Sequence, residues 1–466
     1  MKYEFTKHSD NKSLIMFFTG WGMDATLFRN IDIHCNLVVI WDYEDFNIDV
    51  SLFNGYQSIY LFAWSFGVFA ASQFINEHPS LPITFKMAIN GTQFPIDDNR
   101  GIPQAMFSAT LKNLSERSLM KFYRRICRDG NQFGKFTAHL PNRTIKSLHD
   151  ELVYINASTA SSKCAPIVWN KVIASKCDLI FPFENQLNGW TELCETLEIE
   201  ETGSHLPDDF ETLISRNIIN KHLIRQKFSD SFNGNYDNNA IIQRKIASSL
   251  YDKWKVTVGI RQDANILEIG CGTGFLTRLY AQNAFPSRLV LNDLCNIPTI
   301  TLNLNVTDYE FIENDAELLS FPDNSFDYIV SSSAIQWFEN LPKFFHKAHK
   351  WLKSQGALVL STFGIYNMKE INDYIKISLN YKDSNWYNNE IKRNFDIVLL
   401  SEEYETMLFD SPLQVLRHIQ STGVNSVSSK NVPGSVLRHL LSSYKSVDGK
   451  FQLTYNPIYI IAINNK

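Results

Sequence analysis

The pentapeptide Ala63-Trp64-Ser65-Phe66-Gly67 has the residue types of a nucleophilic site. It lies between an apolar run and a segment expected to form a helix. A serine on such a tight strand-to-helix turn is presented as a nucleophile, and the residues two positions before and after it must be small. Ala63 stands where this motif has its first glycine. Taken alone, the pentapeptide fits a plain helix start as well as it fits a nucleophile.

An acid and a histidine follow in the chain order that a Ser-His-Asp hydrolase of this type requires. Asp178 comes just after the expected strand Lys171–Ser175. His205 comes just after the strand-like run Thr196–Glu200. Each side chain thereby leaves the carboxyl end of a strand, as the acid and the base of such a site do. We therefore predict that these two residues form a catalytic triad with Ser65.

The turn Thr19-Gly20-Trp21-Gly22 follows the first expected strand and contains two glycines. Such a turn can direct a backbone N–H toward the serine. We predict that the amides of Trp21 and Phe66 form an oxyanion hole, in which one donor lowers the barrier by about 3 kcal/mol. A simple glycine turn is the alternative for Trp21.

These motifs resemble those of the pimeloyl-[acyl-carrier protein] methyl ester esterases of biotin synthesis, and more closely those of the BioG type. The resemblance spans most of residues 1–215 and rests on Thr19-Gly20-Trp21-Gly22-Met23-Asp24, Trp64-Ser65-Phe66-Gly67, Asp178 with Pro182, and Gly203-Ser204-His205 with Pro207. It implies an α/β-hydrolase domain that removes a methyl ester from a carrier-bound acyl chain.

Four basic residues crowd the end of the expected helical stretch Gln104–Arg128, namely Lys121, Arg124, Arg125 and Arg128. Side chains three and four positions apart share a helix face. These residues therefore predict a local positive patch on a chain whose net charge is −5. Such a patch could dock an acidic acyl-carrier protein. A solvated helix face is the equally weighted alternative.

A second kind of chemistry is indicated by the segment from Glu268 to Gly274. An expected strand ends at the acid, and Gly270, Gly272 and Gly274 then alternate with other residues before a helix begins at Phe275. Glycines let the backbone approach a cofactor closely at this kind of turn. The spacing is that of S-adenosylmethionine (SAM) sites in Rossmann-like methyltransferases.

Further acids follow the next strands in the same register. Asp293 ends the second expected strand, where a carboxylate can accept both ribose hydroxyls. Asp315 follows the third strand and can take the adenine amino group. We predict that the residues binding SAM are Glu268, Gly270, Gly272, Gly274, Asp293, Asp315, Ala316 and Ser331.

The segments around and after this site resemble the malonyl-[acyl-carrier protein] O-methyltransferases of the BioC type. The resemblance covers residues 222–466 and rests on Phe228, Tyr236, Gln243, Ser331–Trp337, Ser361–Gly364, Leu416–Ile419, Thr422–Asn425 and Leu453–Tyr455. It implies methyl transfer from SAM to the free carboxylate of a carrier-bound malonyl group. That carboxylate is ionised at neutral pH, so no general base is expected. A lysine or arginine is expected to hold it, and the insertion Tyr366–Lys430 is suggested to cover the acyl site.

The elements that must position these residues fall into two halves. The chain has 466 residues, of which 44% are hydrophobic, and a single core rarely exceeds ~250–300 residues. Strands alternate with helices in both halves, which indicates α/β domains. We predict an α/β-hydrolase domain over 1–215 and a Rossmann-like, class I SAM-dependent methyltransferase domain over 216–466. The expected strands are 14–18, 38–41, 58–62, 84–89 and 171–175, then 265–268, 288–292, 309–313, 326–331 and 357–362, with a late antiparallel edge pair around 451–463.

Composition excludes several other classes of protein. No apolar run reaches the ~18 residues of a membrane span, and Met1–Asp10 lacks the apolar core of a secretory signal. Seven cysteines occur without C-x-x-C spacing, which favours free thiols over disulfides or a metal site. The sequence contains no basic stripe of the kind that binds nucleic acid. We therefore expect a cytoplasmic enzyme that uses no metal and binds neither membrane nor nucleic acid.

Two other functions fit the same motifs. The first is a carboxylesterase of other acyl esters fused to a methyltransferase of small molecules. The second makes the first half a catalytically inactive, hydrolase-like module that binds the carrier protein for the methyltransferase.

Overall fold

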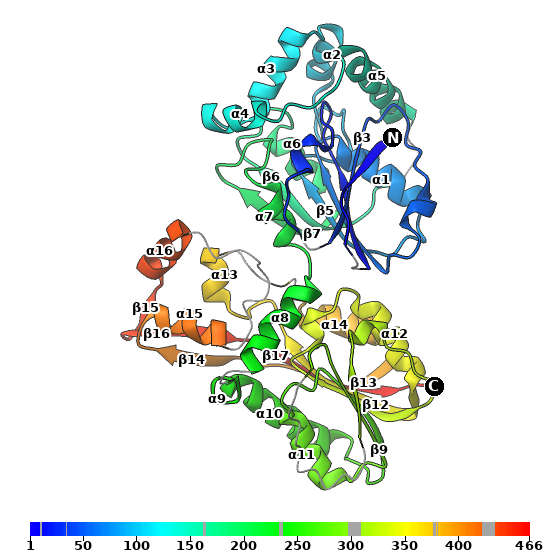
Figure 1. Ribbon diagram of the computed structural model, residues 1–466, viewed down its shortest axis with the longest axis vertical. Helices are drawn as coiled ribbons and strands as arrows, with labels where there is room; N and C mark the ends of the chain where they lie inside the picture. Colours follow the sequence, from blue (N-terminus) through cyan, green and yellow to red (C-terminus); the bar gives the residue numbers. More distant parts are fainter. Residues whose placement is uncertain are drawn as a thin grey trace. The chain divides into compact units, whose positions relative to one another are not determined.

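The computed structural model describes residues 1–9, 12–33, 35–161, 165–232, 236–296, 309–375, 379, 381–421 and 434–466. The chain divides into two compact units, Met1–Ile214 and Ser215–Lys466. Both have an α/β architecture, and Figure 1 draws the first in blue to green and the second in green to red. Within the described ranges, no helix is both long and apolar enough to cross a membrane.

The first unit is built on a seven-stranded sheet with the order β1-β3-β2-β4-β5-β6-β7. Strands β2 to β7 run parallel, whereas β1 pairs with β3 in the antiparallel sense. Strands β2 and β4 are buried along their whole length, as expected for apolar runs in a sheet covered on both faces. The strands are β1 (Lys2–Lys7), β2 (Ser13–Phe18), β3 (Asn36–Trp41), β4 (Ser58–Trp64), β5 (Ile83–Ile89), β6 (Trp169–Ser175) and β7 (Cys194–Glu200).

Four helices between β5 and β6 gather beyond one end of this sheet (Figure 1). They are α2 (Gln104–Lys112), α3 (Glu116–Ile126), α4 (Gly130–Thr137) and α5 (Ile145–Ser161). The single helical stretch expected over Gln104–Arg128 is therefore two helices. Ser115 explains the break, because its side chain caps α3 and exchanges hydrogen bonds with Ser118 in a capping box. The remaining helices are α1 (Gly67–Glu77), α6 (Phe183–Trp190) and α7 (Phe210–Ser215).

The order of strands in the first sheet changes direction between β2 and β4. After β2 the chain adds β3 on one side and then returns to add β4 on the other. Connections that leave in opposite directions leave a crevice outside the carboxyl ends of the two central strands, where ligands bind in open α/β sheets. The Thr19–Gly22 turn follows β2, and Ser65 follows β4. The fold therefore brings both predicted elements to the same crevice.

The second unit has a larger sheet with the order β10-β9-β8-β11-β12-β17-β13. The first five of these strands run parallel, and β17 lies antiparallel to both of its neighbours. Here the order reverses between β8 and β11, at the glycine-rich segment. The strands are β8 (Asn265–Ile269), β9 (Arg288–Asp293), β10 (Glu310–Glu313), β11 (Phe326–Ser332), β12 (Leu352–Phe363), β13 (Phe395–Glu402) and β17 (Pro457–Asn464).

The prediction that two late strands around 451–463 form an antiparallel edge pair is wrong. Strand β16 (Lys450–Tyr455) belongs to a separate three-stranded sheet with β14 (Glu405–Phe409) and β15 (Ser446–Val447). Strand β17 lies inside the large sheet, not at its edge. The two strands cannot pair as a hairpin because only Asn456 separates them, and a tight hairpin needs two loop residues. The Asp448-Gly449 turn instead joins β15 to β16.

Helices of the second unit flank both sheets (Figure 1). They are α8 (Lys221–Phe232), α9 (Tyr236–Asn239), α10 (Ile241–Thr257), α11 (Phe275–Ala284), α12 (Leu341–Trp351), α13 (Lys369–Ile375), α14 (Ser384–Ile391), α15 (Pro412–Ser421) and α16 (Gly434–Ser443). The insertion Tyr366–Lys430 contributes α13, α14, α15 and two strands, of which β13 forms an edge of the large sheet. Its residues 422–430, including the Thr422–Asn425 motif, lie outside the described residues.

Candidate active sites

Ser65 stands on a strained turn between β4 and α1. Its φ is +60°, in the left-handed region that non-glycine residues seldom adopt. Close backbone contacts hold the turn in place: a Cβ on Gly67 would lie 2.4 Å from the carbonyl oxygen of Phe18, and one on Gly91 would lie 2.4 Å from that of Ser65. Both positions therefore require glycine. Strain maintained by surrounding structure is typical of functional sites.

The structure brings Ser65, His205 and Asp178 together in one hydrogen-bonded chain. His205 Nε2 lies 2.9 Å from Ser65 Oγ. His205 Nδ1 lies 2.9 Å from Asp178 Oδ2. The side chains of the histidine and the acid are 1% and 0% exposed, so the ion-pairing atoms are shielded from water. The arrangement has the geometry needed to deprotonate a serine hydroxyl.

Asp178 is held by further donors. Its Oδ1 accepts the backbone N–H of Ile180 at 2.7 Å and of Phe181 at 3.0 Å. Its Oδ2, which faces the histidine, also accepts from Gln186 Nε2 at 3.1 Å. The Phe181 ring stacks on the His205 imidazole with an interplanar angle of 4°. These contacts fix both the carboxylate and the imidazole plane.

Asn90 is a supporting residue that the sequence motifs did not reveal. Its Nδ2 donates to the carbonyl oxygens of Ser204 at 2.8 Å and His205 at 3.0 Å. Its Oδ1 accepts the N–H of Ser175 at 3.0 Å. One buried amide thus connects the loop of the histidine to the strand that precedes Asp178. Its only sequence signal is its position directly after β5, because its partners lie 85 to 115 residues away.

The predicted oxyanion turn lies against the serine. A Cβ on Gly20 would be 3.0 Å from Ser65 Cβ, so the backbone approaches the nucleophile closely. Gly22 has a φ of +81°, and Met23 N–H donates to Gly20 O, which closes a tight turn. Among the described residues, the N–H groups of Trp21 and Phe66 have no protein acceptor. Both are therefore available to a ligand oxygen.

Three side chains from other elements hold carbonyl groups of this turn. Tyr43 Oη donates to Thr19 O at 2.7 Å, and Tyr123 Oη donates to Gly22 O at 3.0 Å. Arg143 Nη1 donates to Met23 O at 3.1 Å. A peptide plane carries the carbonyl of one residue and the N–H of the next, so fixing the first also fixes the second. These contacts hold the backbone on both sides of Trp21, whose own N–H shares its plane with Gly20 O, the acceptor of Met23 N–H. The turn is thereby preorganised.

The arginine of this set belongs to a buried ionic cluster. Arg143 Nη2 lies 3.1 Å from both Asp42 Oδ1 and Glu151 Oε2, and all three side chains are less than 5% exposed. Burial raises the pKa of Glu151 to about 7, although Arg143 acts in the opposite direction.

The four basic residues do not share one helix. Lys121, Arg124 and Arg125 lie on α3, whereas Arg128 follows its end. Arg128 is engaged by Asp208 at 2.8 Å and Asp129 at 3.4 Å. Arg125 donates to the carbonyl of Leu179, the residue after Asp178. The exposed positive charge is therefore concentrated on α3.

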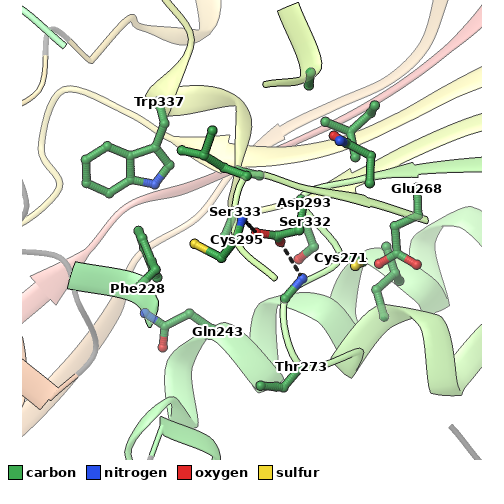
Figure 2. A pocket seen from close by; sticks show the side chains of 18 of the residues that line it. Phe228, Gln243, Glu268, Cys271, Thr273, Asp293, Cys295, Ser332, Ser333 and Trp337 are labelled. Atoms are coloured by element: carbon green, nitrogen blue, oxygen red, sulfur yellow. Dashed lines mark hydrogen bonds between the residues drawn. The ribbon is translucent and has the colours of Figure 1, made fainter. Parts of the chain in front are cut away.

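A large cavity lies at the carboxyl ends of β8 and β9 in the second unit, with about 930 Å³ of empty volume. Of the predicted cofactor residues, the lining includes Glu268, Gly270, Gly272, Asp293, Asp315 and Ala316. Figure 2 shows Phe228, Gln243 and Trp337 at one end of the cavity, with Glu268 at the other.

The glycine-rich turn has the conformation that its composition predicts. Gly270, Gly272 and Gly274 have φ values of +64°, +51° and +85°. A Cβ on Gly270 would lie 2.3 Å from the Cβ of Ala334, so the contact excludes any side chain. A Cβ on Gly272 would meet no atom within 4 Å. The cavity therefore stays open beside this residue.

The predicted acids of the second unit are partly engaged by the protein itself. Glu268 Oε2 accepts from Thr277 Oγ1 at 2.7 Å and Tyr280 Oη at 2.6 Å, and burial raises its pKa to about 7. Asp293 accepts the N–H of Gly272 at 2.9 Å and that of Cys295 at 3.0 Å (Figure 2). Burial raises the pKa of Asp293 as well.

Lys221 is a cavity residue that the motifs did not reveal. Its Nζ lies 3.1 Å from Asp315 Oδ1 and 2.9 Å from Glu317 Oε2. Burial opposes the charge on Lys221, but these acids outweigh it and raise the pKa. The ammonium therefore stays charged and occupies one oxygen of Asp315. Nothing in the local sequence indicates this pairing, since the partners are 94 residues apart.

Two predicted cofactor residues lie outside the cavity lining. Gly274 caps the N-terminus of α11. Ser331 is fully buried in β11 with an Oγ that has no hydrogen-bond partner, and Ser332 and Ser333 line the cavity in its place. Side chains alternate between the faces of a strand, so an offset of one residue moves a side chain away from a site.

Comparison with known proteins identifies the chain. A family model described as "Pimeloyl-ACP methyl esterase BioG" matches residues 1–212, and one described as "Methyltransferase domain" matches residues 267–360. A malonyl-[acyl-carrier protein] O-methyltransferase of Bacteroides fragilis is 37% identical over 97% of this chain and 93% of its own length. The chain belongs to the malonyl-[acyl-carrier protein] O-methyltransferase family. It is a member with a BioG domain and a methyltransferase domain in one polypeptide.

Other members of the malonyl-[acyl-carrier protein] O-methyltransferase family match one half of the chain. One from Calditerrivibrio nitroreducens is 37% identical over 50% of this chain and 92% of its own length. The crystal structure of BioG from Haemophilus influenzae is 34% identical, with a TM-score of 0.39, and covers 44% of this chain and 94% of its own. Each of these two relatives covers about half of this chain.

Proposed function

We propose that this protein is a bifunctional enzyme of biotin synthesis. Residues 216–466 transfer a methyl group from SAM to the free carboxylate of malonyl-[acyl-carrier protein]. Residues 1–215 form an α/β-hydrolase domain that hydrolyses the methyl ester of pimeloyl-[acyl-carrier protein]. The observation that carries the hydrolytic half is the continuous Ser65–His205–Asp178 chain, with 2.9 Å at each link. Family membership supports the methyl-transferring half.

The hydrolytic geometry supports a two-step reaction. Ser65 Oγ attacks the ester carbonyl while His205 Nε2 accepts the hydroxyl proton, which it then gives to the departing methanol. Water repeats the same steps on the acyl-enzyme and releases the carboxylate. Asp178 holds the imidazole and stabilises its positive charge, and the N–H groups of Trp21 and Phe66 receive the charge that develops on the carbonyl oxygen.

Two observations indicate that the large cavity of the second unit fits SAM. Gly272 leaves open space, and Gln243 Oε1 and Thr273 Oγ1 are buried without a protein partner. When bound there, SAM supplies an electrophilic methyl group on a sulfonium. Asp293 would hold the ribose hydroxyls, and Asp315 and Ala316 would contact the adenine.

The two activities make chemical sense in sequence. Methylation cancels a charge that an apolar elongation pocket would have to desolvate at a cost of several kcal/mol. Hydrolysis then restores the carboxylate after four methylenes have been added. To spare the malonyl ester, the hydrolytic site must prefer the longer chain. At ~0.8 kcal/mol per methylene, burial gives about 3 kcal/mol, or roughly a hundredfold preference.

The basic face of α3 is the proposed docking surface for the acidic carrier protein. Lys121 and Arg124 are exposed on it, and Arg125 connects it to the loop of Asp178. Complementary charge of this kind raises the association rate more than the affinity. The proposal predicts that charge reversal on α3 slows hydrolysis of carrier-bound esters at low salt.

Mass spectrometry of malonyl-[acyl-carrier protein] incubated with SAM and the Ser65→Ala protein tests the proposal directly. The expected product is about 14 Da heavier, the mass by which a methyl ester exceeds its carboxylic acid. Wild-type protein given pimeloyl-[acyl-carrier protein] methyl ester should release methanol. Methylation of free malonate in preference to the carrier-bound form would favour the small-molecule alternative. Failure of a fluorophosphonate to label Ser65 would favour an inactive binding module.

A further inference from the structure

A second cavity adjoins the proposed SAM cavity in the second unit. It has about 380 Å³ of empty volume. The two cavities share Phe228, Tyr236, Gln243, Ser333 and Trp337 as lining residues. A group bound in the second cavity would therefore lie next to a ligand in the first. The sequence motifs did not assign this cavity.

The lining of the second cavity is uncharged and largely apolar, with a few polar groups. Beside the shared residues it includes the apolar Phe363 and Met368 and the polar Gln336, Asn367, Tyr381 and Tyr455. No lysine, arginine, histidine, aspartate or glutamate is among the described residues that line it. Burial raises the pKa of Tyr381 to about 12 and also raises that of Tyr455, so both phenols keep their protons at neutral pH. The cavity thus presents hydroxyl and amide groups in an aromatic setting.

Several of these groups have unused hydrogen-bonding capacity. Ser333 Oγ is buried without a partner, and Ser333 has a φ of +56°, a strained conformation at the end of β11. Gln336 Oε1 is also buried without a partner. Tyr381 Oη accepts from Asn367 Nδ2 at 2.9 Å, which leaves its own proton available. Unsatisfied buried polar atoms indicate that a ligand completes the site.

The chemistry of carboxyl methylation favours such a lining. An oxygen lone pair of the carboxylate forms the new bond to the methyl carbon. The carbon–sulfur bond breaks with its electron pair remaining on sulfur, and no proton moves. An anion and a cation become two neutral products, so charge falls in the transition state. A lysine or arginine on the carboxylate would stabilise the ground state more than the transition state and slow the reaction.

We propose that this second cavity binds the attacking carboxylate of the malonyl group, through the neutral hydroxyl donors of Ser333, Tyr381 and Tyr455. The inference rests on the proposed methyltransferase function. It replaces the sequence-based expectation of a lysine or arginine with uncharged donors, which orient the carboxylate without suppressing its nucleophilicity.

His418 is the positioning residue for one of these donors. Its Nε2 lies 2.9 Å from Tyr455 Oη, and its imidazole is 9% exposed on α15. Burial lowers the pKa of His418, so the ring is neutral at pH 7. When its Nε2 carries the proton and donates to Tyr455 Oη, the phenol proton is directed to the carboxylate.

The inference is tested with Tyr381→Phe and Tyr455→Phe in the full chain that also carries Ser65→Ala. Each variant should lower kcat/KM for malonyl-[acyl-carrier protein] about tenfold, because a hydrogen bond to a charged group is lost. A second readout is affinity for malonyl-[acyl-carrier protein] in the presence of S-adenosylhomocysteine, which should fall by a similar factor. Affinity for S-adenosylhomocysteine itself should change less than about twofold.

Tyr387→Phe is the matched control. Tyr387 is fully buried and its hydroxyl lies 3.5 Å from Thr362 Oγ1, but it lines neither cavity. The Tyr387→Phe variant should leave kcat/KM, the affinity for malonyl-[acyl-carrier protein] and the affinity for S-adenosylhomocysteine unchanged. Unchanged kcat/KM and carrier-protein affinity in both tyrosine variants would overturn the inference while the proposed function stands. Absence of methylation by the Ser65→Ala protein would instead overturn the proposed function and the inference with it.

The role of His418 has its own test. His418→Gln keeps a side-chain N–H near the position of Nε2, whereas His418→Leu does not. Folded His418→Leu should reproduce the loss seen for Tyr455→Phe, and His418→Gln should recover most of it. Combining His418→Leu with Tyr455→Phe should add little to either change. A positioning role would be contradicted if His418→Leu and His418→Gln caused equal losses and if these losses added to that of Tyr455→Phe.

Discussion

Individual residues far apart in the chain hold the reactive groups of both units. Asn90 bridges the histidine loop and the strand before Asp178. Glu268 is fixed by two hydroxyls and titrates close to neutral pH. Neither residue is a reacting group of the proposed chemistry, yet each sets the position or the charge of its surroundings. Substitution of either residue should therefore act through the position or the charge of its surroundings, and not through loss of a reacting group.

Asn90→Ala should lower kcat for ester hydrolysis by about 10- to 100-fold with little change in KM, because a displaced imidazole loses its alignment with Ser65. Steady-state kinetics on a methyl ester measures this. Asn185→Ala is the control, since Asn185 also bridges two carbonyls, those of Asp98 and Gly101, but away from His205. An equal loss in both variants would mean that Asn90 acts through general stability.

Glu268→Gln should remove a pH dependence of stability. Burial raises the pKa of Glu268 to about 7 in the fold, against 4.5 for an unperturbed glutamate, so the native state binds the extra proton between these values. The contribution of Glu268 to stability is therefore fully present below about pH 4.5 and is lost as pH rises toward 7, by up to about 3 kcal/mol. Hydrogen exchange at β8 from pH 5 to 7 should show a smaller decline in the variant. The exposed Glu310→Gln should retain the wild-type decline.

At the scale of elements, the oxyanion turn depends on contacts from the helices beyond the sheet. Tyr123 is on α3, while Arg143 precedes α5 and Tyr43 follows β3. All three hold carbonyl groups of one short turn. The same α3 carries the basic residues on its other face. The helix therefore has two roles, one toward the turn and one toward solvent.

Tyr123→Phe should reduce kcat for ester hydrolysis about three- to tenfold, since loss of one hydrogen bond of ~1 kcal/mol loosens the turn. The double variant Tyr43→Phe/Tyr123→Phe should lose more than the sum of the two free-energy changes if the donors act together. Tyr56→Phe, at the amino-terminal side of β4, is the control. A normal rate in the double variant would show that the turn keeps its conformation unaided.

At the scale of the whole molecule, both units place their site at the same kind of position. In each sheet the strand order reverses between two neighbouring parallel strands, and the reactive turns follow these two strands. In the first unit these are β2 and β4, and in the second β8 and β11. The physical reason is common to both: divergent connections leave a crevice at the carboxyl ends of parallel strands. Each unit has its own crevice, so we expect two independent activities.

Selective inactivation tests that independence. Ser65→Ala should abolish ester hydrolysis and leave methyl transfer at the wild-type rate. Gly270→Ala should abolish methyl transfer and leave ester hydrolysis at the wild-type rate, because its Cβ would meet Ala334 at 2.3 Å in the SAM cavity. Gly259→Ala is the control for the second change, since its φ of +72° carries a similar backbone penalty with no atom within 4 Å. Loss of both activities in either single variant would contradict independence.

The sequence by itself determined the local features of this protein. Strong apolar runs predicted most of the central strands, and short motifs placed Ser65, the glycine-rich turn and Asp293 at strand ends, because local sterics require particular residues there. Only the tertiary structure decided the contacts between distant segments, which are the Asn90 bridge, the donors on the oxyanion turn and the pairing of Lys221. It also decided that β16 and β17 belong to different sheets. Such contacts join residues tens to more than a hundred positions apart, and each partner taken singly is an ordinary polar residue. The lining of the second cavity is of the same kind, since its hydroxyls converge only when the strands and helices that carry them have packed.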